Sequence, residues 1–179
     1  MTGPEAISDQ DLRDELALRA LSTSYAAAAD LRDGDRFAAL FVEDGELVVP
    51  DYPVDFGPVL TRSGRERLRQ IPDFLRQYPR TFHQVTNHEF AIDGDTAAGN
   101  VQCVAHHLTA IDPSVPPGSI DGSEAEEAPA KPEAIDFIWY IRYRDDYRRV
   151  DGDWKFQRRS IHLQFVEERP VLRMGLPLS

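Results

Sequence analysis

The chain has 179 residues, a length that fits one domain with a sizeable core. Its hydrophobic content of 41% and charged content of 28% are ordinary for a globular protein in water. The net charge of −11 and the isoelectric point near 4.8 argue against a nucleic-acid binder and against docking on an anionic membrane, because both need a basic surface.

Cysteine usage and hydropathy indicate the compartment. Cys103 is the only cysteine, so the chain cannot form an internal disulfide. No apolar run approaches the roughly 20 residues that cross a bilayer, and the polar N-terminus lacks the apolar core of a signal peptide. We therefore expect a cytoplasmic protein.

The N-terminal part of the chain predicts a long helix. Residues 1–8 are expected to form a flexible leader, and Ser8 or Asp9 can cap the helix that follows. Leucines and alanines recur at helical spacing from about Asp9 to Arg32. Gly34 suits the C-terminal cap of this helix, since glycine readily adopts the left-handed conformation that such caps use.

A segment of short elements, turns and prolines comes next. Strand residues stop at Pro50, and Pro72 is expected to kink a helix because it cannot donate a backbone hydrogen bond. In chain order we expect a short helix capped by Asp35 at 36–41, a turn at 42–45, a strand at 46–49, a proline-rich loop at 51–60 and a helix at 65–76.

After Pro79 the pattern changes to strands. Asp-Gly pairs at 93–94 and 151–152, flanked by apolar residues, predict tight hairpin turns. Segment 111–134 is rich in proline and acidic residues, and we expect a mobile hairpin insertion, either an unstructured tip or a lid over a pocket. The predicted strands and tail cover 82–92, 96–110, 135–150, 154–166 and, for the tail, 167–179.

Helices followed by antiparallel hairpins define an α+β fold. We expect one domain at 9–166, in which a curved sheet wraps over the long helix and leaves a cavity. Two residues there carry acid/base chemistry: Asp30 near the end of the helix and His83 near the start of the first long strand. A histidine has an unperturbed pKa near ~6.5, which suits a general base. Taken singly, Asp30 also fits a helix-end acid, and His83 a core histidine.

The ordered elements, ending in Val150-Asp151-Gly152-Asp153-Trp154-Lys155-Phe156, resemble the NTF2-like superfamily. More narrowly they resemble its SnoaL-like branch, which includes scytalone dehydratase and the hexachlorocyclohexane dehydrochlorinase. The resemblance covers about Leu12 to Val166. It implies a cone-shaped barrel, with N-terminal helices packed on a curved, mainly antiparallel sheet.

In the lyases of this branch, the resemblance implies that an Asp and a His form a catalytic pair. Asp30 occupies the acid position within Ala29-Asp30-Leu31-Arg32-Asp33-Gly34-Asp35, and His83 precedes the family's Thr-Asn pair, here Thr86-Asn87. Ala29 departs from the pattern, since scytalone dehydratase has a tyrosine there. The implied substrate-binding positions are Tyr25, Tyr52, His107, Ile141, Tyr143 and Ile161; a one-residue slip would put His106 in place of His107.

The expected function is a cofactor-independent lyase, isomerase or cyclase acting on a small hydrophobic oxygenated substrate of polyketide, steroid or aromatic type. No metal or cofactor is expected, because the histidine spacing carries no zinc signature and nucleotide-binding motifs are missing from the sequence. Two alternatives remain: a small structural subunit of an aromatic-ring hydroxylating dioxygenase, or a non-catalytic NTF2-like binding domain. We expect a homodimer or homotrimer, with no nucleic-acid or membrane partner.

Overall fold

The computed structural model describes residues 8–110 and 132–174. It contains a single sheet of six strands; two helices precede the first strand, and the other helical elements lie between the second and third strands in the sequence. None of the described helices is both long enough and apolar enough to cross a bilayer. The helical elements are α1 (Asp9–Asp30), α2 (Gly34–Ala39), α3 (Arg65–Arg69), α4 (Ile71–Phe74) and the 3₁₀ turn η1 (Leu75–Gln77); the strands are β1 (Phe41–Asp51), β2 (Asp55–Ser63), β3 (Arg80–Asp93), β4 (Thr96–Ala110), β5 (Ala134–Val150) and β6 (Asp153–Val171).

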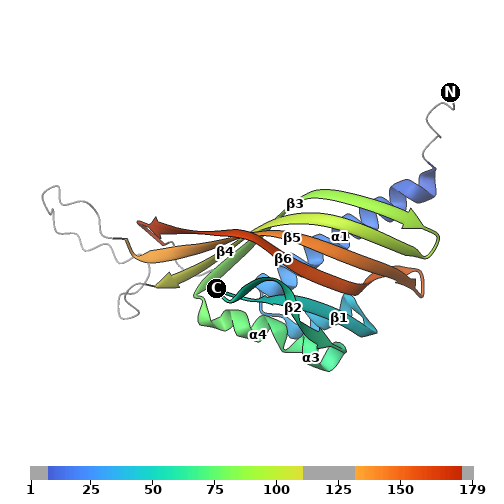
Figure 1. The fold of residues 1–179 in the computed structure, drawn as a ribbon. Helices are drawn as coiled ribbons and strands as arrows, with labels where there is room; N and C mark the ends of the chain where they lie inside the picture. The colour runs from blue at the N-terminus through green and yellow to red at the C-terminus, as the bar shows by residue number, and fades with distance from the viewer. Residues whose placement is uncertain (1–7, 111–131, 175–179) are drawn as a thin grey trace, which may run out of the picture.

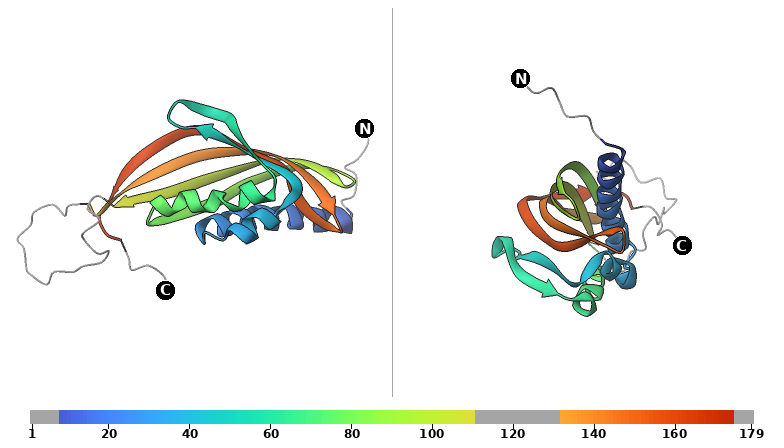
Figure 2. Two further views of the ribbon diagram at one scale, coloured as in Figure 1. Left: turned by 90° about the horizontal axis from the view of Figure 1, so that it is seen from below. Right: turned by 90° about the vertical axis from the view of Figure 1, so that its right-hand side faces the viewer.

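The sheet is ordered β2-β1-β6-β5-β4-β3. All neighbouring strands are antiparallel except β1 and β6, which run parallel. The sheet is strongly curved, and the helices lie along one face of it (Figures 1 and 2). The predicted α+β class and mainly antiparallel curved sheet are therefore confirmed.

The first helix begins as predicted but ends differently. Ser8 caps α1 through a capping box with Asp11. The residue with positive φ after the helix is Arg32 (φ 59°), whereas Gly34 opens α2, whose cap is Asp33 rather than Asp35. Gly34 is needed for packing, because a Cβ there would lie 2.2 Å from the carbonyl oxygen of Arg69. The prediction that Gly34 caps the first helix was wrong.

The segment from residue 41 to residue 77 holds most of the corrections. The expected turn at 42–45 lies inside β1, which pairs with β6, and the expected loop at 51–60 holds the start of β2. Pro58 is tolerated because β2 is an edge strand, where one missing backbone donor leaves no partner unpaired. The expected helix at 65–76 is divided into α3, α4 and η1, with Pro72 in the first turn of α4.

The later strands follow the predicted hairpins. The turns at 93–95 and 151–152 join β3 to β4 and β5 to β6. Strand β5 begins at Ala134, which is fully buried, so the expected insertion at 111–134 ends earlier; its residues 111–131 lie outside the described part. Strand β6 continues to Val171, so the strand end predicted at Val166 was wrong and the tail begins later.

The core lies between α1 and the concave face of the sheet. Asp14 clamps the first half of α1 to the β5–β6 hairpin, because its carboxylate accepts two hydrogen bonds from Arg149 and one from Trp154 Nε1. Further along α1, Tyr25 packs its ring against Phe37, with centroids 4.7 Å apart. These contacts bury one face of α1 and leave its last turn beside β3.

Candidate active site

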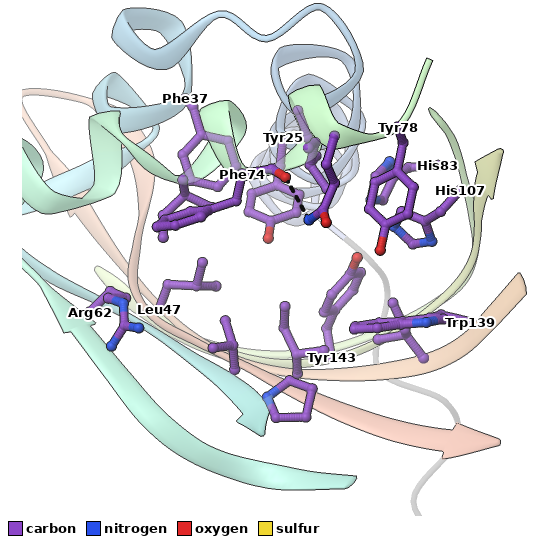
Figure 3. Close-up of a pocket in the computed structure, with 18 residues that line it drawn as sticks. Tyr25, Phe37, Leu47, Arg62, Phe74, Tyr78, His83, His107, Trp139 and Tyr143 are labelled. Carbon is purple, nitrogen blue, oxygen red and sulfur yellow. Dashed lines mark hydrogen bonds between the residues drawn. The ribbon is translucent and has the colours of Figure 1, made fainter. Parts of the chain in front are cut away.

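A cavity of about 290 Å³ lies between the helices and the concave face of the sheet. Most of its wall is apolar or aromatic, and a few polar groups reach it (Figure 3). The lining residues include Phe37, Leu47, Val49, Ile71, Phe74, Leu75, Trp139, Ile141 and Ile161, with Tyr25, Tyr78, His83, His107, Tyr143, Gln77 and Arg62 as the polar members. Small apolar cavities with few polar groups are typical ligand sites.

His83 lines this cavity, and Asp30 contacts it without lining the cavity itself. Asp30 is the last residue of α1, and its Oδ1 lies 2.7 Å from Nδ1 of His83. Residues two apart on a strand share a face, so Thr81 reaches the same carboxylate and donates to Oδ1 at 2.7 Å. The backbone N–H of His83 donates to Oδ2 at 2.9 Å. One carboxylate is thus held by three donors from β3.

Arg32 holds Thr81 and the end of α1 in place through hydrogen bonds. Its left-handed conformation turns the chain back after α1, and its Nη1 donates to Thr81 Oγ1 at 2.6 Å and to the carbonyl oxygen of Asp30 at 3.0 Å. The Thr81 hydroxyl therefore accepts from Arg32 and donates to Asp30. This chain of hydrogen bonds fixes the orientation of the carboxylate.

The contact also assigns the His83 tautomer. Burial alone would raise the pKa of Asp30, but the hydrogen bonds from His83 and Thr81 together with the His83 charge outweigh it, and the pKa is lowered. An ionised carboxylate only accepts, so Nδ1 of His83 carries hydrogen. In the neutral ring Nε2 then has a free lone pair, which is the arrangement that a general base needs.

His107 provides a second imidazole in a different state. Its Nδ1 lies 3.2 Å from the carbonyl oxygen of Phe137, which can only accept, and its ring centroid lies 5.7 Å from that of His83. Burial, followed by the repulsion of a charged His83, lowers the pKa of His107 to about 4. His107 is therefore neutral at pH 7 and presents Nε2 as an acceptor.

The state of His107 predicts a pH dependence of stability. The unfolded histidine protonates near pH ~6.5 and the folded one only near pH 4, so the unfolded state binds more protons between these values. The stabilisation is fully present above the unfolded pKa and is lost as pH falls toward the folded pKa. Between pH 7 and pH 5, His107 should account for a loss of about 2 kcal/mol in unfolding free energy.

Urea denaturation of the wild type and of His107→Gln at both pH values measures this loss. Glutamine does not titrate, so the variant should lose about 2 kcal/mol less than the wild type between pH 7 and pH 5. Equal losses in the two proteins would contradict the assignment of His107 as a buried neutral base.

Two tyrosines on opposite walls keep their protons. Burial raises the pKa of both Tyr25 and Tyr143, although the nearby Arg159 charge opposes this. The Arg159 guanidinium lies 4.3 Å from the Tyr25 ring centre and 4.1 Å from that of Tyr143. Neutral phenols beside a fixed positive charge are suited to donate hydrogen bonds to an oxygen that becomes negative.

The structure places five of the six predicted substrate-binding residues on the cavity. Tyr25, His107, Ile141, Tyr143 and Ile161 line it. Tyr52 is not among the lining residues: it lies in the turn between β1 and β2, with its ring 5.4 Å from that of Trp139, which lines the cavity, and 5.7 Å from that of Phe56. The β1–β2 pairing, which was not predicted, carries Tyr52 to the rim beside Trp139, and its role in substrate binding stays a prediction.

The choice between the two adjacent histidines follows from strand alternation. His107 faces the cavity, whereas His106 lies on the other face of the sheet, where its Nδ1 is 2.7 Å from Oδ2 of Asp136. Sequence reasoning missed Tyr78, whose ring lies 5.0 Å from that of His107, and Arg62. Neither belongs to a periodic pattern; Thr81, by contrast, could have been found from its alternation with His83.

No group of three or more His, Cys, Asp and Glu side chains is placed to hold a metal ion within residues 8–110 and 132–174. His83 and His107 are engaged through their Nδ1 atoms with Asp30 and with a backbone carbonyl. The polar groups that remain toward the cavity are imidazole nitrogens, phenols, an amide and one guanidinium. They are suited to bind and protonate or deprotonate an organic molecule.

Helices packed on a strongly curved, mainly antiparallel sheet, with a cavity between them, are typical of the NTF2-like class of cone folds. The SnoaL-like domain family matches residues 10–160. The chain belongs to the SnoaL-like family. No curated protein matches the chain.

Solved structures share this fold over nearly the whole chain. A putative scytalone dehydratase from Novosphingobium aromaticivorans is 22% identical, with a TM-score of 0.67, and the match covers 96% of this chain and 100% of that one. A type 3 hexachlorocyclohexane dehydrochlorinase from Novosphingobium barchaimii is 18% identical, with a TM-score of 0.67 and coverage of 95% and 100%. A putative aromatic ring hydroxylase from Novosphingobium aromaticivorans is 18% identical, with a TM-score of 0.66 and coverage of 88% and 94%.

Proposed function

We propose that the protein is a cofactor-independent lyase, isomerase or cyclase that removes a proton from a small hydrophobic oxygenated substrate. One observation carries the proposal: Nδ1 of His83 is hydrogen-bonded to Asp30 while the histidine lines the cavity. The names of the similar dehydratase and dehydrochlorinase agree with elimination chemistry.

In this mechanism His83 Nε2 takes a proton from a carbon or hydroxyl of the substrate. Asp30 stabilises the imidazolium that forms, since its carboxylate is ionised and already bonded to Nδ1. Tyr25, Tyr78 and Tyr143 can donate to the developing enolate or alkoxide oxygen. The imidazolium then returns the proton to a leaving hydroxyl, or to another carbon in an isomerisation.

The apolar wall supports a hydrophobic substrate and also a dry reaction site. Phe37, Leu47 and Trp139 offer water few hydrogen-bond partners, and hydrogen bonds around His83 are stronger in such a poorly hydrated site. The volume of about 290 Å³ suits a small ring compound of aromatic or short polyketide type. A homodimer or homotrimer and a cytoplasmic location stay predictions.

Proton exchange tests the proposal before the natural substrate is identified. The protein is incubated in D₂O with small cyclic ketones such as 2-tetralone, and with β-hydroxy ketones, and deuterium uptake at the α-carbon and loss of water are followed by NMR. We expect at least one compound to react faster than in buffer alone. Binding of these compounds with no exchange or elimination would contradict the proposal and favour a non-catalytic binding domain.

A further inference from the structure

One arginine lies on the wall of the cavity. Of the described residues that line it, Arg62 is the only arginine or lysine, the side chains whose charge is permanent at neutral pH. Arg62 lies on β2 opposite Leu47 of β1, in the inward-facing register of this pair. Figure 3 shows it at one end of the cavity, with His83 and His107 at the other.

Arg62 has no acidic partner in the described part of the chain. Its guanidinium makes one weak contact, 3.4 Å to the carbonyl oxygen of Thr61. Other arginines around this end of the fold are paired: Arg158 with Glu46 at 2.9 Å, and Arg69 with Asp35 at 2.9 Å. Arg62 is thus half-buried beside an apolar wall and forms no ion pair with a described residue. Its charge therefore makes no ion-pair contribution to the stability of the described fold.

The negative charge of Asp30 does not cancel Arg62. Asp30 does not line the cavity, and its oxygens are already occupied by the donors of His83 and Thr81. The fixed charge that faces the cavity is consequently positive. In a poorly hydrated site the attraction between unlike charges is stronger than in water, and a guanidinium can bind a carboxylate through two parallel hydrogen bonds.

We propose that Arg62 binds an anionic group of the substrate, a carboxylate or an acidic enol, and thereby sets which carbon lies beside His83. The site would then select small ring compounds with an acid at one end and the reacting carbon at the other. The placement of a carbon beside His83 rests on the proposed function; the preference for acids does not. The competing explanation is a solvated arginine on an edge strand, which would show no preference for acids.

Matched pairs of an acid and its amide test the preference directly. Binding of benzoate, benzamide, 2-naphthoate and 2-naphthamide to the whole protein is measured by calorimetry and by the fluorescence of Trp139, which lines the cavity. The wild type should bind the acids more tightly than the amides. Arg62→Gln should weaken binding of the acids roughly tenfold to hundredfold and leave the amides unchanged. Arg62→Lys should retain part of the preference.

Arg158→Gln is the matched control, because it removes the same charge from β6 at a residue that does not line the cavity. It should leave the acid preference intact. The proposal is overturned if the acids do not bind, if they bind no more tightly than the amides, or if Arg62→Gln and Arg158→Gln weaken them equally.

These outcomes are distinct from those of the proposed function. His83→Gln should keep the preference for acids, because the charge that sets it lies at the opposite end of the cavity. If proton exchange is never observed while the acid preference depends on Arg62, the protein is an acid-binding domain. If turnover is observed without that preference, only the role of Arg62 fails.

Discussion

Replacing His83 by glutamine is expected to lower kcat on a substrate found by proton exchange by about 10²–10⁴-fold, the usual contribution of a general base. Glutamine keeps a polar group near Asp30 but cannot accept a proton at neutral pH. The fold should be retained, because β3 remains paired with β4 along its length. Initial rates and circular dichroism, measured on the same samples, separate a loss of catalysis from a loss of folded protein.

His106→Gln is the control for this experiment. The Nδ1 atom of His106 lies 2.7 Å from Asp136, the same separation as in the pair at the cavity, but His106 lies on the other face of the sheet. It should keep the wild-type kcat. Asp30→Asn should also lose activity, since the imidazolium of His83 would lack its counter-charge. Full activity in both Asp30→Asn and His83→Gln would reject the proposed mechanism.

The largest loss of stability is expected for Asp145→Asn. Asp145 accepts two hydrogen bonds from Arg159, at 2.8 Å and 2.7 Å, and both side chains are fully buried. Burial alone would lower the pKa of Arg159, but Asp145 raises it, so the guanidinium stays charged. Without the carboxylate that charge is buried unpaired, which typically costs about 3–5 kcal/mol of unfolding free energy. Urea denaturation measures the loss.

An exposed ion pair serves as the control for the stability loss in Asp145→Asn. Arg76 and Asp73 lie 2.8 Å apart on the surface, and Arg76→Ala should change the unfolding free energy by less than about 1 kcal/mol. Replacing both buried partners, as in Arg159→Met with Asp145→Leu, should cost less than the sum of the single changes, because no charge is left unpaired. A loss below about 1 kcal/mol in Asp145→Asn would contradict the role assigned to the pair.

The buried pair also links stability to the cavity. The Arg159 guanidinium lies 4.2 Å from the ring centre of Phe156, in addition to its contacts with Tyr25 and Tyr143. The Nη1 atom of Arg159 is buried and has no hydrogen-bond partner among the described residues. Aromatic faces thus supply part of the stabilisation. Two of the side chains that contact Arg159, Tyr25 and Tyr143, also line the cavity.

Sequence reasoning failed mainly between residues 41 and 77. Gly45, Pro50 and Pro58 are local turn signals, yet β1 continues through the first two and β2 contains the third. Pairing with β6 stabilises the start of β1, and this partner lies more than 100 residues later in the chain. Local propensity carries no information on such a distant partner. The missed β1–β2 pairing also left Arg62 out of the predicted site.

The sequence by itself determined the class of fold, since helical spacing early and Asp-Gly hairpins late are local patterns, and it singled out Asp30 and His83 as candidates. Only the tertiary structure decided how these side chains are used. Curvature of the sheet over α1 brings Thr81 and His83 to Asp30, selects His107 over His106, and places Arg62 and Tyr78 on the wall. Distances across the fold depend on how strands pair and bend, which a one-dimensional pattern does not record.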